Sequence, residues 1–219
     1  MTNSAARMGR PPVTSRDRII AAARDLIDRD GWERLTLRRL AGELGIGTTT
    51  LYHHVRDREA LLLLLLNDYF ERTPVPSVPE DAEQRIVTVA LAMRDALAAW
   101  PWATEVLAAD GFIAVLGDSA LSYVEAIVSG AKESGRSNEE AVTVFRSIWY
   151  YTVGEILVRA NSARVRAEGW QPDVQSHVDR LDASRMPGLS SIGARWGEFA
   201  ARDTYPDGLR ALVRGLLSR

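Results

Sequence analysis

The residues best suited to chemistry lie close together, and the chemistry that they suit is binding rather than catalysis. Three threonines, Thr48–Thr50, stand at the expected start of a short helix, and Tyr52 and two histidines follow them. Leu51 and Val55 are its apolar positions, so the helix is anchored there and shows its other faces to a partner. Small side chains at a helix N-terminus allow close approach, and the positive end of the helix favours phosphate.

A second short helix precedes this one at the spacing of a known DNA-binding motif. Thr36 is a candidate N-cap, Gly45 ends the helix, and Ile46 is the apolar residue of the turn. The inner face of this helix consists of Leu37, Leu40, Ala41 and Leu44. Residues 35–62 therefore have the layout of a helix-turn-helix, which lays its second helix in the major groove of DNA.

Two longer helices are expected to support this motif. The first has Ser15 as its N-cap and stops at Gly31, with one apolar stripe between them. The other starts after Asp57 and carries leucine at every position of Leu61–Leu66, so it is apolar most of the way round. Such a helix is buried on more than one side. It is either a link that couples two domains or an ordinary core helix.

The rest of the chain predicts more helices and no strand, which gives an all-α fold. A three-proline linker spans residues 73–79. Helices are expected near residues 80–99, 101–109, 118–134, 138–167, 173–181, 189–201 and 206–218, with a break at 186–188. We divide the chain into a flexible basic arm (1–14), a three-helix DNA-binding domain (15–60) and a larger helical domain (61–219). The arm either contacts DNA or is a solvated tail.

Charge and composition agree with a local nucleic-acid surface. Through Arg58 the chain has 11 arginines and seven carboxylates, whereas the remainder has 16 basic and 22 acidic residues. Positive charge therefore gathers where the DNA-reading motif lies. The chain has no cysteine, which fits a cytoplasmic protein and excludes thiolate metal sites. No apolar run reaches the roughly 18–20 residues of a membrane span.

The N-terminal segment resembles the DNA-binding domain of TetR-family transcriptional regulators, which are all-helical homodimers. The resemblance covers residues 15–66 and rests on TLRRLAGELG, the turn residue Ile46, LYHHV, and then a basic residue and leucines at Arg58 and Leu61. The LYHHV segment and the later YPDGLRALVRGL are most similar to the tetracycline-repressor-like branch. The resemblance implies a double-stranded DNA operator as partner.

The resemblance also implies a role for each residue of the motif. Arg38, Thr48 and Thr49 are expected to contact base edges, and Thr50 to place its methyl on a thymine. The remaining candidates are Tyr52 and Arg58 at phosphates, His53 facing the groove, and His54 at the backbone or a base. Tyr52 has the alternative of packing on the core edge, and His54 that of a cation at a helix C-terminus.

The family carries a small-molecule pocket in its large domain, so the resemblance implies an effector. The candidates are mainly aromatic, and their alternative role is plain core: Met93, Trp100, Trp102, Phe112, Phe145, Trp149, Tyr150 and Glu155. Glu155 and Arg159 either orient a polar group or pair at a dimer interface. Tetracycline repressors hold the drug with magnesium through histidine. Because His177 is the only histidine of the larger domain here, a tetracycline–magnesium ligand is not expected, and we predict no metal or cofactor.

The expected homodimer is a four-helix bundle formed by residues 138–167 and 206–218 of both copies. Its predicted interface consists of Val142, Ile148, Tyr151, Leu209, Leu212, Val213 and Leu216. The resulting hypothesis is a homodimeric repressor released from a near-palindromic operator by a small, largely apolar or aromatic ligand. The alternative is a DNA-binding dimer without small-molecule control. An enzyme is not expected, because no nucleophile elbow, phosphate loop or metal spacing is present.

Overall fold

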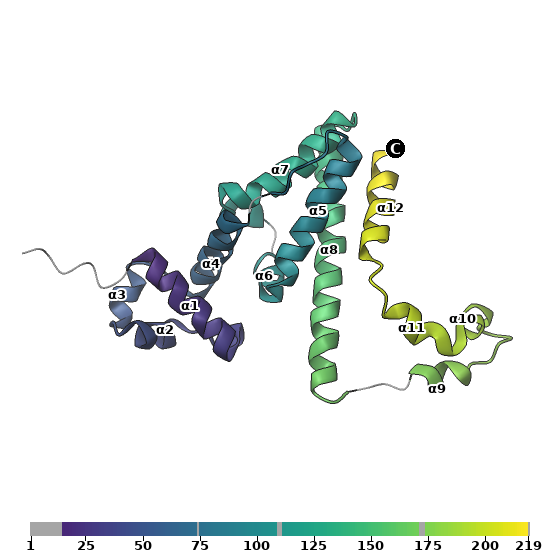
Figure 1. Cartoon of the computed structure of the whole chain (residues 1–219), viewed down its shortest axis with the longest axis horizontal. Coiled ribbons are helices and arrows are strands. Elements are labelled where there is room, and N and C mark those ends of the chain that lie inside the picture. The colour runs from purple at the N-terminus through teal and green to yellow at the C-terminus, as the bar shows by residue number, and fades with distance from the viewer. Residues whose placement is uncertain (1–14, 74, 109–110, 171–173, 219) are drawn as a thin grey trace, which may run out of the picture. The chain divides into compact units, whose positions relative to one another are not determined.

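The structure is a computed structural model that describes residues 15–73, 75–108, 111–170 and 174–218 (Figure 1). Within these ranges the regular structure is helical and no residue lies in a β-strand, which confirms the all-α prediction. The predicted arm, residues 1–14, lies outside the described residues. Contacts divide the chain into two compact units. One holds the residues up to 75 together with 102–122, and the other holds 76–101 and 123–219.

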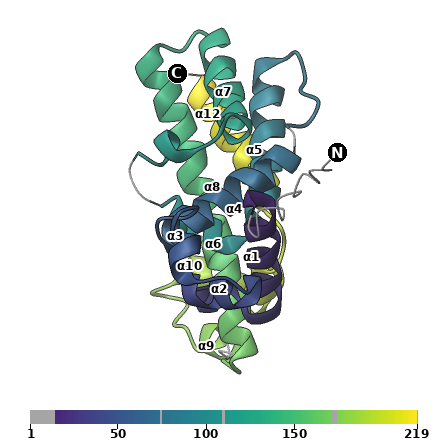
Figure 2. The ribbon, with the colours of Figure 1, turned by 90° about the vertical axis from the view of Figure 1, so that its left-hand side faces the viewer.

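The first unit contains the DNA-binding motif. Its helices, including two single 3₁₀ turns, are α1 (Arg16–Asp30), η1 (Trp32–Arg34), α2 (Leu37–Leu44), α3 (Thr48–Tyr52), α4 (Arg58–Arg72), α6 (Pro101–Val106) and η2 (Phe112–Val115). Helix α1 packs on both α2 and α4, and α2 packs on α3. Figure 2 shows these N-terminal helices facing the viewer. Helix α4 packs as part of this unit, so the compact unit extends beyond residue 60. The functional boundary at residue 60 stays a prediction.

Local signals start and stop these helices as the sequence predicts. The side chains of Ser15, Thr36 and Asp57 accept hydrogen bonds from backbone N–H groups three residues later, at 3.3, 3.2 and 2.8 Å. Each bond satisfies an N–H that lacks a partner within its helix. Gly31 and Gly45 follow α1 and α2 with φ of 84° and 66°, a backbone region that favours glycine.

The core of the first unit is built from leucine and isoleucine. Ile19, Ile20 and Leu26 of α1 are buried, as are Leu40 and Leu51 of the motif. In the leucine run, Leu61, Leu62, Leu65 and Leu66 are buried, while Leu63 and Leu64 are partly exposed. Helix α4 therefore fixes its inner face in this unit and keeps a partly accessible leucine pair on its other side.

The second unit is organised around one long helix. Its elements are α5 (Ala82–Ala98), α8 (Asn138–Ala167), α9 (Val174–Asp179), α10 (Pro187–Ile192), η3 (Gly193–Arg195), α11 (Trp196–Ala200) and α12 (Tyr205–Leu217). The division between units falls inside α7 (Asp118–Glu133), after Ser122. Helices α5, α8 and α12 pack on one another and run side by side in Figure 1. The short elements α9–α11 pack among themselves.

Two ion pairs give the direction of α12 against α5. Asp203, just before α12, pairs with Arg94 near the end of α5, and Arg214 near the end of α12 pairs with Glu83 near the start of α5. The two helices are therefore antiparallel. The capping box predicted for α8 is present, because Ser137 and Glu140 each bond the backbone N–H of the other.

Two predicted helices differ from the structure. The helix expected over residues 101–109 ends at Val106. The single helix expected over 189–201 is wrong, because α10 begins earlier, at Pro187, and ends at Ile192, before Gly193, whose φ is 55°. Proline suits the first position of a helix, where its missing N–H costs nothing. Helix α10 therefore begins within residues 186–188, where a break was predicted. The interruption of the helix follows at Gly193.

The two glycines of α2 provide a matched stability test. At Gly45 the positive φ strains any L-residue, so Gly45→Ala is expected to cost about 1 kcal/mol of unfolding free energy. Gly42 lies exposed inside the helix with open space around its Cα, so Gly42→Ala is expected to stabilise by about 0.5–1 kcal/mol. Chemical denaturation of both variants measures the difference. Equal effects at the two positions would contradict the assigned turn geometry.

Candidate DNA interface and effector pocket

Helix α3 has the exposure that a DNA-reading helix needs. Leu51 and Val55 are 0 % and 3 % exposed and hold it in the unit. Tyr52 is 56 % exposed, so the alternative that it packs on the core edge is not observed. The other polar candidates are exposed as well: Thr48, Thr49, Thr50, His53 and His54. One side of the helix is therefore fixed, and the other sides present hydrogen-bonding groups.

The turn between α2 and α3 sets the angle of the recognition helix. The N–H of Gly45 donates to the carbonyl of Gly42, and the N–H of Ile46 to that of Ala41. These bonds and the left-handed backbone at Gly45 close α2 and redirect the chain within two residues. Gly47 then leads directly into α3, whose first N–H groups point away from the helix body.

Helix α2 carries two neighbouring arginines with different surroundings. Arg39 pairs with Asp30 and also donates to the carbonyl of Arg34, so it braces α2 against α1. Arg38 is exposed and makes no hydrogen bond or ion pair with another described residue. Its guanidinium is therefore available to an external acceptor such as a guanine edge.

Arg58 differs from the other candidates, because its guanidinium is used inside the unit. Its Nε donates to the carbonyl of Leu35 at 2.9 Å and one Nη to that of Trp32 at 2.7 Å. The guanidinium also lies 4.9 Å from the centre of the Trp32 ring. The predicted phosphate contact must compete with these bonds. Arg58 joins the start of α4 to the segment before α2, a role that the sequence did not indicate.

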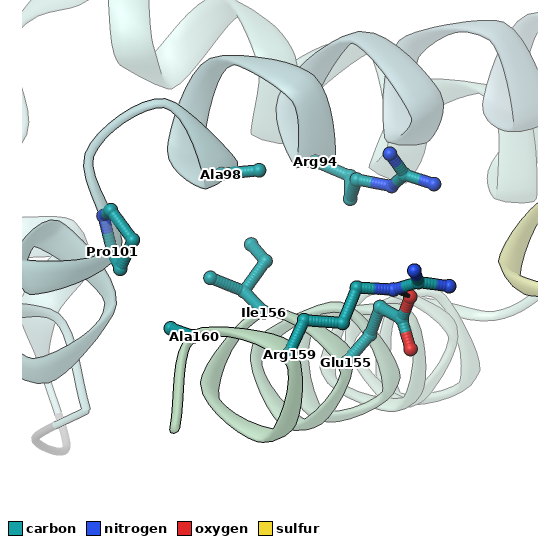
Figure 3. Close-up of a pocket in the computed structure, with 7 residues that line it drawn as sticks. All are labelled: Arg94, Ala98, Pro101, Glu155, Ile156, Arg159 and Ala160. Carbon is teal, nitrogen blue, oxygen red and sulfur yellow. Dashed lines mark hydrogen bonds and ion pairs between the residues drawn. The ribbon is translucent and has the colours of Figure 1, made fainter. Parts of the chain in front are cut away.

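The second unit contains a pocket of about 280 Å³ between α5 and α8. Its lining residues are Arg94, Ala98, Pro101, Glu155, Ile156, Arg159 and Ala160. Figure 3 shows the charged side chains together at one end and the apolar ones toward the other. The pocket thus combines an apolar wall with a few polar groups, as ligand sites do.

The charged end of the pocket is a network of ion pairs. Asp203 accepts from Arg94 at 2.7 Å and from Arg159 at 3.2 Å, and Arg159 also pairs with Glu155. The hydrogen bond from Arg94 lowers the pKa of Asp203, so this carboxylate stays ionised at neutral pH. The Arg94 guanidinium also lies 4.9 Å from the ring of Tyr205.

Most of the predicted effector residues do not line this pocket. Glu155 does, whereas Met93, Phe145 and Trp149 are buried side chains of the second unit. Trp100 is partly exposed, and Trp102 and Phe112 belong to the first unit. Tyr150 is 58 % exposed on the outer side of α8, beside Arg146, so its predicted place in an enclosed pocket is not observed. No role was predicted for Arg94 from the sequence. The one feature that could have indicated it is its charge within the mainly apolar α5.

The predicted dimer residues divide into two groups. Ile148, Leu209 and Val213 are 0 % exposed, because they fill the core between α8 and α12 of one chain and have no surface left for a partner. The prediction for these three side chains is therefore corrected. Val142 is 53 % exposed, and the partly exposed members are Tyr151, Leu212 and Leu216.

Comparison with known proteins agrees with this architecture. Residues 19–65 match the model of bacterial regulatory proteins of the tetR family, and residues 75–219 match the tetracyclin repressor-like C-terminal domain. The chain belongs to the TetR family. As a TetR-family protein it is a DNA-binding transcriptional regulator, and its relatives are regulators rather than enzymes.

Two relatives and one solved structure show how far the similarity extends. The transcriptional repressor DrrR1 of Streptomyces coeruleorubidus is 29% identical over 95% of this chain and 79% of its own length. The class E tetracycline repressor protein of Escherichia coli is 32% identical over 92% and 90%. The crystal structure of ActR from Streptomyces coelicolor in complex with actinorhodin has a TM-score of 0.75 at 23% identity, covering 94% of this chain and 97% of that one. The similarity to the ActR structure shows that the two proteins share a fold.

The described residues of this TetR-family protein contain neither a membrane-spanning helix nor a cluster of metal ligands. No described helix is long and apolar enough to cross a membrane. No group of three or more histidine, aspartate or glutamate side chains in these residues is arranged to hold a metal ion.

Arg58 yields a prediction that separates its structural role from a phosphate contact. Arg58→Lys keeps the charge but cannot bond both carbonyls, so it is expected to lower the unfolding free energy by roughly 1–3 kcal/mol. Arg56→Lys, at a side chain that is 89% exposed, serves as the control and should leave stability unchanged. Thermal and urea unfolding measure both variants. Unchanged stability of Arg58→Lys would show that the carbonyl bonds contribute little.

Proposed function

We propose that this TetR-family protein is a homodimeric repressor. It binds a near-palindromic operator through α3 and leaves it when a small, largely apolar or aromatic molecule binds the second unit. The exposure of α3 carries the proposal: its apolar residues are fixed in the unit, and its hydroxyl, imidazole and phenol groups face outward. The outward-facing polar groups of such a helix are available to bind the major groove of DNA.

The residues assigned to DNA fall into base contacts and backbone contacts. Arg38, Thr48 and Thr49 are proposed at base edges, and Thr50 at a thymine methyl. Tyr52 is proposed at a phosphate, His53 faces the groove, and His54 contacts the backbone or a base. Arg58 serves first to hold α4, and its charge adds to the positive potential near the phosphates.

Dimerisation supplies the second recognition helix. Along α8 the large apolar side chains that are exposed are Val142, Tyr150 and Val158. Leu212 and Leu216 of α12 are partly exposed at a four-residue interval. These residues are the proposed interface. Two-fold symmetry then requires a near-palindromic operator with half-sites about one DNA turn apart.

Two observations support control by a small molecule. The pocket between α5 and α8 has an apolar wall and a polar end. Among its relatives, DrrR1 is named a repressor, and ActR has been crystallised with actinorhodin. An effector needs only to bind the DNA-incompetent state more tightly to lower operator affinity.

The alternative function is DNA binding without small-molecule control. The burial of Met93, Phe145 and Trp149 favours it, because these side chains already fill apolar space that an aromatic ligand would occupy. In that case the second unit serves dimerisation or a protein partner. The two functions differ in whether any small molecule releases the operator.

Selection of duplexes from a random DNA library tests the DNA half of the proposal. We expect an enriched near-palindrome that the protein binds as a dimer. Tyr52→Ala should then lose affinity at least about tenfold without loss of stability, since the side chain is exposed and a phosphate bond is worth about 1.5 kcal/mol or more. Val78→Ala, at an exposed side chain outside both α3 and the proposed interface, is the control and should keep full affinity. Failure to enrich any sequence, or full affinity of Tyr52→Ala, would contradict the assignment.

Release from the selected operator tests the effector half. Fluorescence anisotropy of a labelled operator is measured while a library of apolar and aromatic metabolites is added. We expect at least one compound to lower the anisotropy to that of free DNA, with the midpoint rising as protein concentration rises. A library in which every compound leaves the complex intact would favour the alternative function.

A further inference from the structure

We propose that the pocket between α5 and α8 is an anion receptor, in which Arg94 and Arg159 hold the carboxylate or sulfonate of an otherwise apolar ring compound. The inference rests on the proposed function in placing the effector in the second unit, and it adds the chemical class of that effector. The sequence offered Arg159 as a candidate to orient a polar group, whereas Arg94 was not predicted.

The two arginines already hold a carboxylate between them. Arg94 comes from α5 and Arg159 from α8, and both donate to Asp203, at 2.7 and 3.2 Å. Planar guanidinium groups bind carboxylates through paired N–H donors. The guanidinium groups of Arg94 and Arg159 are therefore already placed to bind the anionic group of a ligand. Asp203 occupies it from the segment that precedes α12.

Asp203 is held weakly enough to be replaced. Its side chain is 48% exposed, that of Arg159 is 49% exposed, and only the Arg94 side chain, 18% exposed, is mostly covered. Ion pairs at such exposure contribute little to stability, because water competes for both partners. A ligand anion that also buries apolar surface has an advantage that Asp203 lacks, since its ring removes additional area from water.

The guanidinium groups also have donors to spare. Each carries five N–H bonds. Arg94 uses one Nη for Asp95 and the other for Asp203, while its Nε is buried without a partner among the described residues. Arg159 uses Nε for Glu155 and one Nη for Asp203. The site therefore favours a ligand that brings hydrogen-bond acceptors.

The acidic residues make a cationic ligand the poorer fit. Glu155 and Asp203 both accept from Arg159, so their charges are already compensated within the network. Toward the other end, Ala98, Ile156 and Ala160 give a wall of small and branched apolar side chains, with Pro101 beside them (Figure 3). A flat ring suits this wall, and an anionic group suits the arginines.

A pair of fluorescent probes with the same ring system tests the inference. The anion is 1-anilinonaphthalene-8-sulfonate, and N-phenyl-1-naphthylamine lacks the sulfonate and is neutral. Both are titrated into the full chain, into Arg159→Gln and into Arg164→Gln. Arg164 is the matched control, because it lies on the same helix, is 61% exposed and forms an i,i+4 pair with Glu168 away from the pocket.

We expect the parent protein to bind the sulfonate probe at least about tenfold more tightly than the neutral probe, the value of one charge-assisted hydrogen bond. Arg159→Gln should remove this preference and leave neutral-probe affinity within about twofold, while Arg164→Gln changes neither. Equal binding of the two probes by the parent would overturn the proposal. Arg159→Gln protein that keeps the preference, or that loses both probes equally, would overturn it as well.

Operator binding separates this inference from the proposed function. Arg159→Gln lies outside the DNA-binding motif, so it is expected to keep its affinity for the selected operator. If the operator is released by a neutral compound and the probes show no charge preference, the anion site fails and the repressor function stands. If the probes show the preference but no compound releases the operator, the anion site stands and effector control fails.

Discussion

The ion pairs of Asp68 fix the position of α4, and the arrangement of the DNA-binding unit depends on it. Asp68 is 6% exposed and accepts from Arg24 of α1 at 2.5 Å and from Arg72 at 3.0 Å. A buried carboxylate without its partners costs several kcal/mol, so loss of Arg24 would destabilise the contact of α4 with α1. The neighbouring Asn67 bonds the backbone of Val115 and Gly117, which holds the other side of α4.

This constraint extends to the recognition helix through short contacts. Arg58, at the start of α4, bonds two carbonyls before α2, and α2 carries α3 through the turn at Gly45. A displacement of α4 therefore changes the support of α3 without breaking its apolar anchors, Leu51 and Val55. In the second unit Asp203 is the exposed charge that two arginines hold.

The sequence predicted the parts of the fold that local chemistry determines. Caps at Ser15, Thr36, Asp57 and Ser137 mark helix starts because each side chain bonds a backbone group three residues away. The exposure of α3 followed from its lack of apolar residues. Arg58 and Arg94 could not be assigned in this way, because their partners lie 23 and 109 residues from them. Aromatic content pointed to Phe145 and Trp149 as a pocket, but large apolar side chains fill cores as readily, and the charged pocket wall was missed.

We propose that two copies hold their recognition helices about one DNA turn apart and that a bound effector alters this spacing. The chain has no cysteine, so Glu43→Cys on α2 places a single spin label on each copy. Pulsed electron paramagnetic resonance then measures the distance between the two labels in the operator complex. We predict a narrow distribution in the operator complex, and a displaced or broader one after release. Absence of any dipolar signal, or one distribution that neither operator nor effector alters, would contradict the claim.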